Sequence, residues 1–239
     1  MYHNPILDKP QSELRLSLGI EAIDNLFLGF TLGDFAVIYG SSAVQSLLPR
    51  LCVKAQLPYQ LGGLATNVLF VDGSNSFRLY DISDVAQTWE LDPKQVLERI
   101  FVSRAFTAYQ LTSIILDKLQ TAVTKFGTKV VIISNLAQLF LDKDIPKKEA
   151  EEIFTQLTNY LSTFAEEHQI ILIITHRPYH WSKRTKLFKH TLCKSANVVM
   201  SIKKSKQVPY FSLEKHPHLQ LGKAEFQSNN CTLIDFVKG

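Results

Sequence analysis

The residues with the clearest chemical pattern form a basic segment in the second half of the chain, residues 177–190. It lies within a longer stretch, between Glu167 and Glu214, that contains nine lysines and arginines and no acidic residue. The whole chain carries a net charge of only +4, so positive charge is concentrated here. Lysine and arginine neutralise phosphates, and aromatic side chains among them can stack on unpaired bases, so the pattern predicts contact with a polyanion. The residues we expect at this contact are Arg177, Tyr179, His180, Trp181, Lys183, Arg184, Lys186 and Lys189, and Phe188 could also stack on a base.

A second interpretation of the basic segment is structural. It could be a solvated loop whose Trp181 and Phe188 pack onto the core or against a protein partner. Three further lysines follow on a predicted hairpin, where they either extend the positive surface or prevent unwanted pairing of a sheet edge. These three are Lys203, Lys204 and Lys206.

The histidines and cysteines do not predict a metal site. Cys52, Cys193 and Cys231 are far apart and lack the paired spacing typical of zinc ligands. Several histidines fall in or near the basic segment, but no carboxylate or cysteine joins them at a suitable spacing. We therefore expect no metal, and the sequence indicates no other bound cofactor.

Short apolar runs, rich in valine and isoleucine, alternate with longer amphipathic stretches. The runs 35–39, 68–71, 100–102, 130–133 and 170–174 are typical of strands covered on both faces, as in a parallel sheet. Helical spacing of apolar residues predicts helices over 108–125 and 147–168. Three short runs near the end, 198–202, 210–213 and 232–236, indicate hairpin strands. The expected fold is therefore α/β, a mostly parallel sheet between helices with antiparallel hairpins at its C-terminal edge.

Length and composition favour one soluble domain. The 239 residues are 46% hydrophobic, which suits a single α/β core better than two small domains. No apolar stretch approaches the roughly 20 residues needed to cross a bilayer, and the first residues lack the pattern of a signal peptide. We expect a cytoplasmic, nucleoid-associated protein without membrane contact.

Several short motifs, in a fixed order, resemble one protein family. They include residues 16–24 (LSLGIEAID), 56–58 (QLP), 62–64 (GGL), 91–93 (LDP), 103–106 (SRAF) and 216–219 (HPHL). Over about residues 14–237 the chain resembles the archaeal and eukaryotic branch of RecA-type recombinases, the RadA-like proteins, and their shorter paralogs such as RadB. The resemblance implies a RecA-like core of the P-loop NTPase fold over residues 16–239, preceded by an extension of residues 1–15.

The residues that this family needs for ATP hydrolysis are absent at the matching positions. A phosphate-binding loop needs glycines, a lysine for the phosphates and a serine or threonine for magnesium. Ser134 occupies the family's acidic magnesium position, and Ser74 that of its catalytic glutamate. We expect a pseudo-ATPase without hydrolysis, with weak nucleotide binding through backbone amides as the open alternative. The matching loop has no lysine and no second glycine: it reads Gly40, Ser41, Ser42, Ala43, Val44, Gln45, Ser46.

Together these observations lead to one functional hypothesis and two alternatives. The basic segment matches the second DNA-binding loop of the recombinases, so we expect binding of DNA, with single-stranded DNA favoured over duplex. The hypothesis is an accessory factor in homologous recombination and DNA repair, whose partner is a RadA-type recombinase or another paralog. The first alternative is a protein-interaction module that docks on an active recombinase without touching DNA. The second is a residual ATPase completed by a partner in trans.

Overall fold

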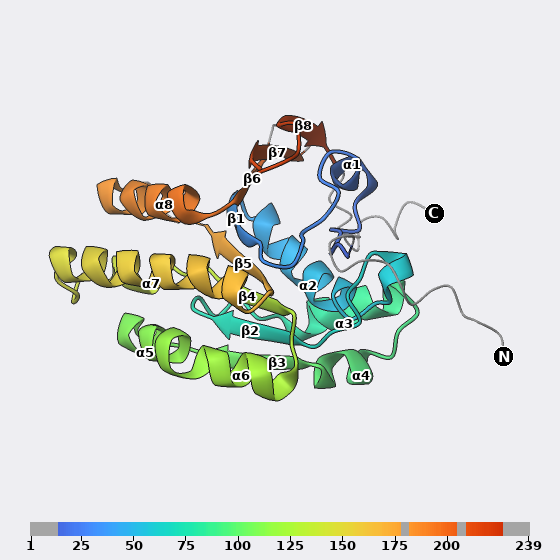
Figure 1. Ribbon diagram of the computed structural model, residues 1–239, viewed down its shortest axis with the longest axis horizontal. Helices are drawn as coiled ribbons and strands as arrows, with labels where there is room; N and C mark the ends of the chain where they lie inside the picture. The colour runs from blue at the N-terminus through green and yellow to red at the C-terminus, as the bar shows by residue number, and fades with distance from the viewer. Residues whose placement is uncertain (1–13, 178–181, 205–208, 227–239) are drawn as a thin grey trace, which may run out of the picture.

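The computed structural model describes residues 14–177, 182–204 and 209–226, which form one eight-stranded sheet with helices on both faces (Figure 1). The strand order is β3-β2-β4-β5-β1-β6-β7-β8. Six strands are parallel, and β7 and β8 are antiparallel additions at one edge. The strands are β1 (Phe35–Gly40), β2 (Val68–Asp72), β3 (Ile100–Arg104), β4 (Val130–Ser134), β5 (Ile171–His176), β6 (Val198–Lys204), β7 (Pro209–Lys215) and β8 (Gly222–Glu225).

This arrangement confirms the predicted fold class, and each predicted strand within the described residues is present. The predicted strand 232–236 lies outside the described residues. One detail of the prediction was wrong: β3 is not covered on both faces, because it is the edge strand and only Ile100 in it is buried. Among the described residues, no helix is long and apolar enough to cross a membrane.

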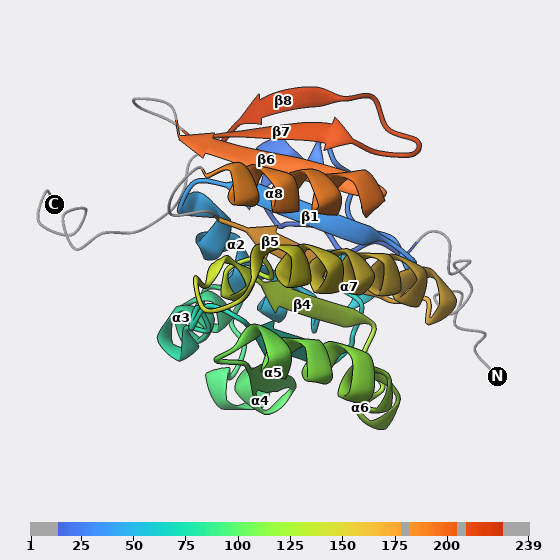
Figure 2. The same cartoon turned by 90° about the vertical axis from the view of Figure 1, so that its left-hand side faces the viewer.

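The helices divide into two layers because side chains alternate along each strand. On β1, Ala36 and Ile38 pack into one core with α2, whereas Val37 and Tyr39 pack into the other with α7 and α8. Figure 2 shows α5, α7 and α8 in front of the sheet, with β7 and β8 at its upper edge. The helices are α1 (Glu21–Asp24), α2 (Ala43–Lys54), α3 (Leu79–Thr88), α4 (Pro93–Glu98), α5 (Ala108–Ser113), α6 (Leu119–Phe126), α7 (Lys147–Glu167) and α8 (Lys183–Ser195), with short turns η2 (Tyr59–Leu61) and η4 (Leu139–Leu141).

Both helices predicted from apolar spacing are present. Helix α7 matches its prediction within one residue. The stretch predicted as one helix, 108–125, contains a π-helical turn, η3 (Ile114–Lys118), between α5 and α6. The Thr107 hydroxyl caps its start by accepting a bond from the Gln110 amide, and Gly127 in a left-handed conformation ends it.

The basic segment is mostly helical, which corrects the expectation of a loop. Helix α8 begins one residue after Ser182, whose hydroxyl accepts a hydrogen bond from the Thr185 amide at 3.0 Å. Thr185, Phe188 and Leu192 are buried at helical spacing, so α8 lies with one face against the core. Lys183 and Lys186 are exposed on this helix, whereas Arg184 and Lys189 are half-buried.

Candidate functional site

The loop after β1, where the family resemblance implies a phosphate-binding loop, is very short. Only Ser41 and Ser42 separate β1 from α2. Gly40 has φ +136°, and a Cβ there would collide with the carbonyl of Ile202 on the neighbouring strand β6. The Ser41 amide donates to that same carbonyl at 2.8 Å. The chain thus turns tightly against β6, and one amide of the turn is already used within the protein.

An arginine from another strand reaches the first turn of α2. Arg177 follows β5, and its guanidinium donates to Oε1 of Gln45 at 2.7 Å. The prediction placed Arg177 on DNA phosphates, but this contact directs its side chain towards Gln45, next to the loop after β1. Residues Ala43, Val44 and Ser46 of the predicted loop belong to α2 itself.

The backbone of Arg177 is held by a second residue, Asn135, which follows β4. The amide of Arg177 donates to Oδ1 of Asn135 at 3.0 Å, and its carbonyl accepts from Nδ2 at 3.3 Å. Asn135 adopts φ +48° and donates its own amide to the Thr175 hydroxyl at 2.9 Å. The contacts between Asn135 and Arg177 therefore link the C-terminal ends of β4 and β5.

A buried carboxylate, Asp72, ends β2 and collects donors from three segments. The Ser134 hydroxyl donates to it at 2.9 Å, and Arg104 on β3 lies 3.3 Å from its other oxygen. Burial opposes its ionisation, but the amides of Ser76 and Phe77 and the Ser134 hydroxyl outweigh burial and lower the pKa of Asp72. Its oxygens are saturated by protein donors, which suits a structural ion pair better than magnesium coordination.

The two serines that stand at the family's acidic positions both lie at Asp72. Ser74 donates its backbone amide to Asp72 at 3.2 Å, while its hydroxyl is buried without a partner among the described residues. Ser134 contributes its hydroxyl, as above. Over the described residues, no group of three histidines, cysteines or carboxylates is arranged to hold a metal ion.

A polar network lies beneath α8, between β1, β5 and the C-terminal strands. The Tyr39 hydroxyl donates to Glu214 at 2.6 Å, and Lys189 on α8 lies 3.6 Å from the centre of the Tyr39 ring. His176 pairs with Tyr39 across β5 and β1 and is 1% exposed. Burial is the larger cause and the charge of Lys189 the smaller one, and together they lower the pKa of His176 to about 4. The ring is therefore neutral at pH 7. Neither ring nitrogen has a hydrogen-bond partner among the described residues.

The predicted DNA-binding residues that the structure describes fall into two groups: side chains that contact the rest of the protein and side chains that are exposed. Arg184 donates to the carbonyls of Asp142 and Ile145, which fixes α8 to the loop before α7. Lys183 and Lys186 are exposed on the first turn of α8. Tyr179, His180 and Trp181 lie outside the described residues, as does Lys206.

Phe188 does not face a nucleic acid, so its expected role in base stacking was wrong. The side chain is 1% exposed and packs against Phe154 and Phe140, with ring centres 4.3 and 6.4 Å away. The structural interpretation of this residue holds instead: it anchors α8 to α7. Lys203 is exposed on β6, consistent with either interpretation of the hairpin lysines.

The first turn of α8 has an unusual electrostatic character. The N-terminus of a helix carries a partial positive charge, so lysines in the first turn raise the energy of the helix and anions lower it. This turn contains Lys183, Arg184 and Lys186 and no acidic residue. The first turn of α7 differs, because Lys147 and Lys148 are paired with glutamates one turn later. The positive charge on α8 is therefore less compensated within the described part of the chain.

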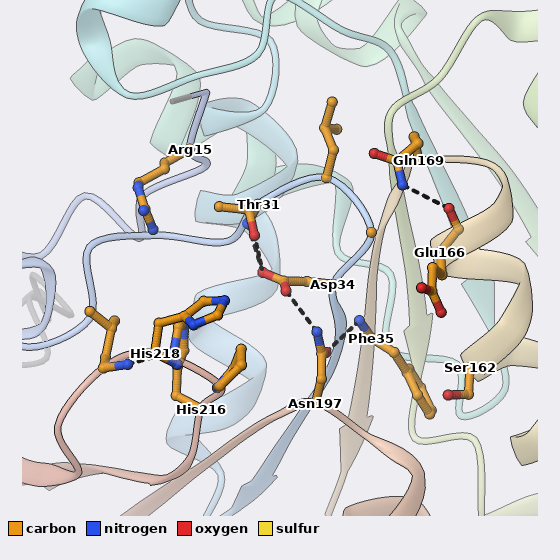
Figure 3. A pocket seen from close by; sticks show the side chains of 14 residues that line it. Arg15, Thr31, Asp34, Phe35, Ser162, Glu166, Gln169, Asn197, His216 and His218 are labelled. Carbon is orange, nitrogen blue, oxygen red and sulfur yellow. Dashed lines mark hydrogen bonds between the residues drawn. The ribbon is translucent and has the colours of Figure 1, made fainter. Parts of the chain in front are cut away.

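A cavity that the sequence did not predict lies at the N-terminal ends of β1, β5 and β6 (Figure 3). Its volume is about 490 Å³, and its wall includes Asp34, His216 and His218. Asp34 is fully engaged, accepting bonds from the amide and hydroxyl of Thr31 and from the Asn197 side chain. The motif 216–219 lies in its wall, but the sequence did not predict the cavity because the other lining residues come from separate parts of the chain.

The chain matches the model of a known protein family. The family model described as Rad51 matches residues 9–202. The matched range contains β1 to β5, α8 and most of β6, and hence nearly all of the residues discussed above.

Proposed function

Because the chain belongs to the Rad51 family, whose members act in recombination and DNA repair, we propose that it is a DNA-binding paralog that serves as an accessory factor and does not itself hydrolyse ATP. The observation that carries this proposal is the first turn of α8, with three cationic side chains and no acidic residue. The partners are DNA, preferentially single-stranded, and a RadA-type recombinase or another paralog.

The proposal of DNA binding is supported by the electrostatics of α8. Lys183 and Lys186 are exposed at a helix N-terminus, where cations are unfavourable unless an anion compensates them. A phosphate at this turn would contact two lysines and also interact favourably with the helix dipole. The first turn of α8 therefore forms a surface suited to a phosphate backbone, although its lysines lower the stability of the helix.

The proposal that ATP is not hydrolysed is supported by the loop after β1 and by Asp72. The two-residue connection of Ser41 and Ser42 is too short to wrap phosphates in the manner of a P-loop. Asp72, the acidic residue at the end of β2, is saturated by protein donors and by Arg104. Neither feature provides a base for the attacking water or a ligand set for magnesium.

DNA binding is tested by fluorescence anisotropy with labelled single-stranded and duplex DNA across a salt series. Each phosphate contact on a single strand contributes about 0.7 to the slope of log K against log salt. The variant Lys183→Ala/Lys186→Ala should therefore reduce the slope by about 1.4. A matched control, Lys118→Ala/Lys125→Ala, removes the same charge from the η3–α6 region and should keep the wild-type slope. Absence of salt-dependent DNA binding by the wild type would refute the proposal.

Hydrolysis is tested by measuring phosphate release from ATP with the protein alone, with single-stranded DNA, and with a RadA-type recombinase that is itself inactivated for hydrolysis. We expect no turnover above background in any of the three. Turnover only in the presence of the inactive recombinase would favour an ATPase completed in trans, and turnover by the isolated protein would refute the proposal outright.

A second candidate function, docking on a recombinase, is favoured by the edge strand β3. Val102 is 42% exposed and Phe106, just after the strand, is 72% exposed. Apolar side chains beside an unpaired strand edge suit a protein partner. If docking is the whole function, Phe106→Ser should abolish binding to the recombinase in surface plasmon resonance, and the wild type should show no affinity for bare DNA.

A further inference from the structure

Arg177 begins the basic segment, yet its known contacts face the protein. Its side chain donates to Gln45 on α2 at 2.7 Å, and both of its backbone polar groups bond the side chain of Asn135. Three hydrogen bonds from two other elements thus fix a single residue. We call this arrangement the Gln45–Arg177–Asn135 tie.

The tie rests on rigid parts of the fold. Asn135 is 4% exposed, and its left-handed backbone is held by the Thr175 hydroxyl. Gln45 lies in the first turn of α2, which follows β1 after only two residues. Since β4, β5 and β1 are adjacent in the sheet, the tie connects the ends of three neighbouring strands.

The chemistry of Gln45 matters as much as its position. A glutamate there would form an ion pair with the guanidinium, whereas the neutral amide oxygen of Gln45 accepts a charge-assisted hydrogen bond without adding a negative charge. Gln45 lies in the first turn of α2, directly after the loop that follows β1. The side chain of Arg177 therefore reaches the region where the resemblance implies a nucleotide.

We infer that Gln45 and Asn135 are positioning residues that fix Arg177, the first residue of the basic segment, so that DNA affinity is set by an internal contact and not by a nucleotide. This inference rests on the proposed function, because it concerns the affinity of the same DNA-binding segment. It assigns Arg177 an indirect role, in contrast to the direct phosphate contacts proposed for Lys183 and Lys186.

The test is a double-mutant cycle on the affinity for labelled single-stranded DNA, measured by anisotropy at several salt concentrations. Gln45→Met keeps the length of the side chain and removes the acceptor without changing charge. It should weaken binding by up to about tenfold, because an arginine that is no longer fixed in the free protein must lose conformational freedom when DNA binds, and it should leave the salt slope unchanged. Gln120→Met, on the exposed face of α6, is the matched control and should bind as the wild type does.

The second arm of the cycle adds Arg177→Met. Because both substitutions break the same contact, the double variant should bind no more weakly than Arg177→Met alone. If the two losses multiply, or if Gln45→Met binds with wild-type affinity, the inference is overturned. Addition of ATP or ADP should change the wild-type affinity by less than about twofold, and a larger change would contradict nucleotide-independent positioning.

Folding of each variant is checked by circular dichroism and thermal unfolding. Should Gln45→Met fail to fold, Asn135→Gly serves in its place, because glycine tolerates the left-handed backbone and removes both bonds to Arg177. Lys183→Ala/Lys186→Ala is measured in the same series. If the wild type does not bind DNA, the proposed function and the inference fail together; if the wild type binds and the tie variants match it, only the inference fails.

Discussion

The wild-type protein should become less stable in mild acid because of His176, and the variant His176→Leu should not show this contribution. The ring is buried beneath α8, and burial together with the charge of Lys189 lowers its pKa from 6.5 to about 4 in the folded protein. Between these two values the unfolded chain binds a proton and the folded protein does not. Protonation therefore favours unfolding, and stability decreases as the pH falls from 6.5 to 4.

The size of the effect follows from the width of this interval. Each pH unit within it costs about 1.4 kcal/mol, so His176 should account for a loss of about 3 kcal/mol by pH 4. At pH 7.5 the leucine variant should be at least as stable as the wild type, because neither ring nitrogen has a hydrogen-bond partner among the described residues. The difference in stability between the two proteins should therefore grow as the pH falls.

The assay is urea unfolding followed by circular dichroism at pH 7.5, 6.5, 5.5 and 4.5. Other titrating groups affect the wild type and His176→Leu equally, so their contributions cancel in the difference. His190→Leu, an exposed histidine on α8, is the matched control and should retain the wild-type pH profile. The reasoning is refuted if His176→Leu loses stability in parallel with the wild type.

Further substitutions test the packing and the buried ion pair by the same unfolding measurement. Phe188→Ala should cost about 3–5 kcal/mol because it empties a buried aromatic site, whereas Leu187→Ala, at a side chain 40% exposed, should cost less than about 1 kcal/mol; equal losses would contradict the described orientation of α8. Asp72→Asn should cost about 2–3 kcal/mol, since it removes the charge that Arg104 and several amides stabilise, and a neutral result would mean that the carboxylate is not structurally required. Gly40→Ala should lower the unfolding temperature by several degrees, because a methyl group there collides with the neighbouring strand, and an unchanged midpoint would refute that close approach.

The sequence predicted the fold because its central strands are buried on both faces and its long helix is strongly amphipathic. Continuous apolar runs such as 130–133 have few alternatives to a central parallel strand. Helix α8 was missed because its charges suggested a loop, although Ser182 as a cap and the spacing of Phe188 and Leu192 carried the signal of a helix. The burial of Phe188 follows directly from that spacing.

The candidate site was predictable only in part, because its contacts join residues far apart in the chain. Gln45 and Arg177 are 132 positions apart, and only the adjacency of β1 and β5 brings them together. The environment of Asp72 depends on the path of residues 73–77, which no periodicity reveals. Residue type alone therefore predicted which positions differ from the family's nucleotide-binding residues, but not which contacts these positions make in the fold.

If α8 binds DNA as proposed, its length limits how much DNA one copy of the protein can cover. From Lys183 to Lys194 the helix rises about 16 Å, which matches roughly five successive phosphates of one strand in B-DNA and fewer in an extended single strand. The exposed lysines on this helix can reach only a few of those phosphates at once. A footprint this small gives modest affinity in isolation, so durable occupancy of DNA would come from avidity, with several copies or a partner engaging the same strand together.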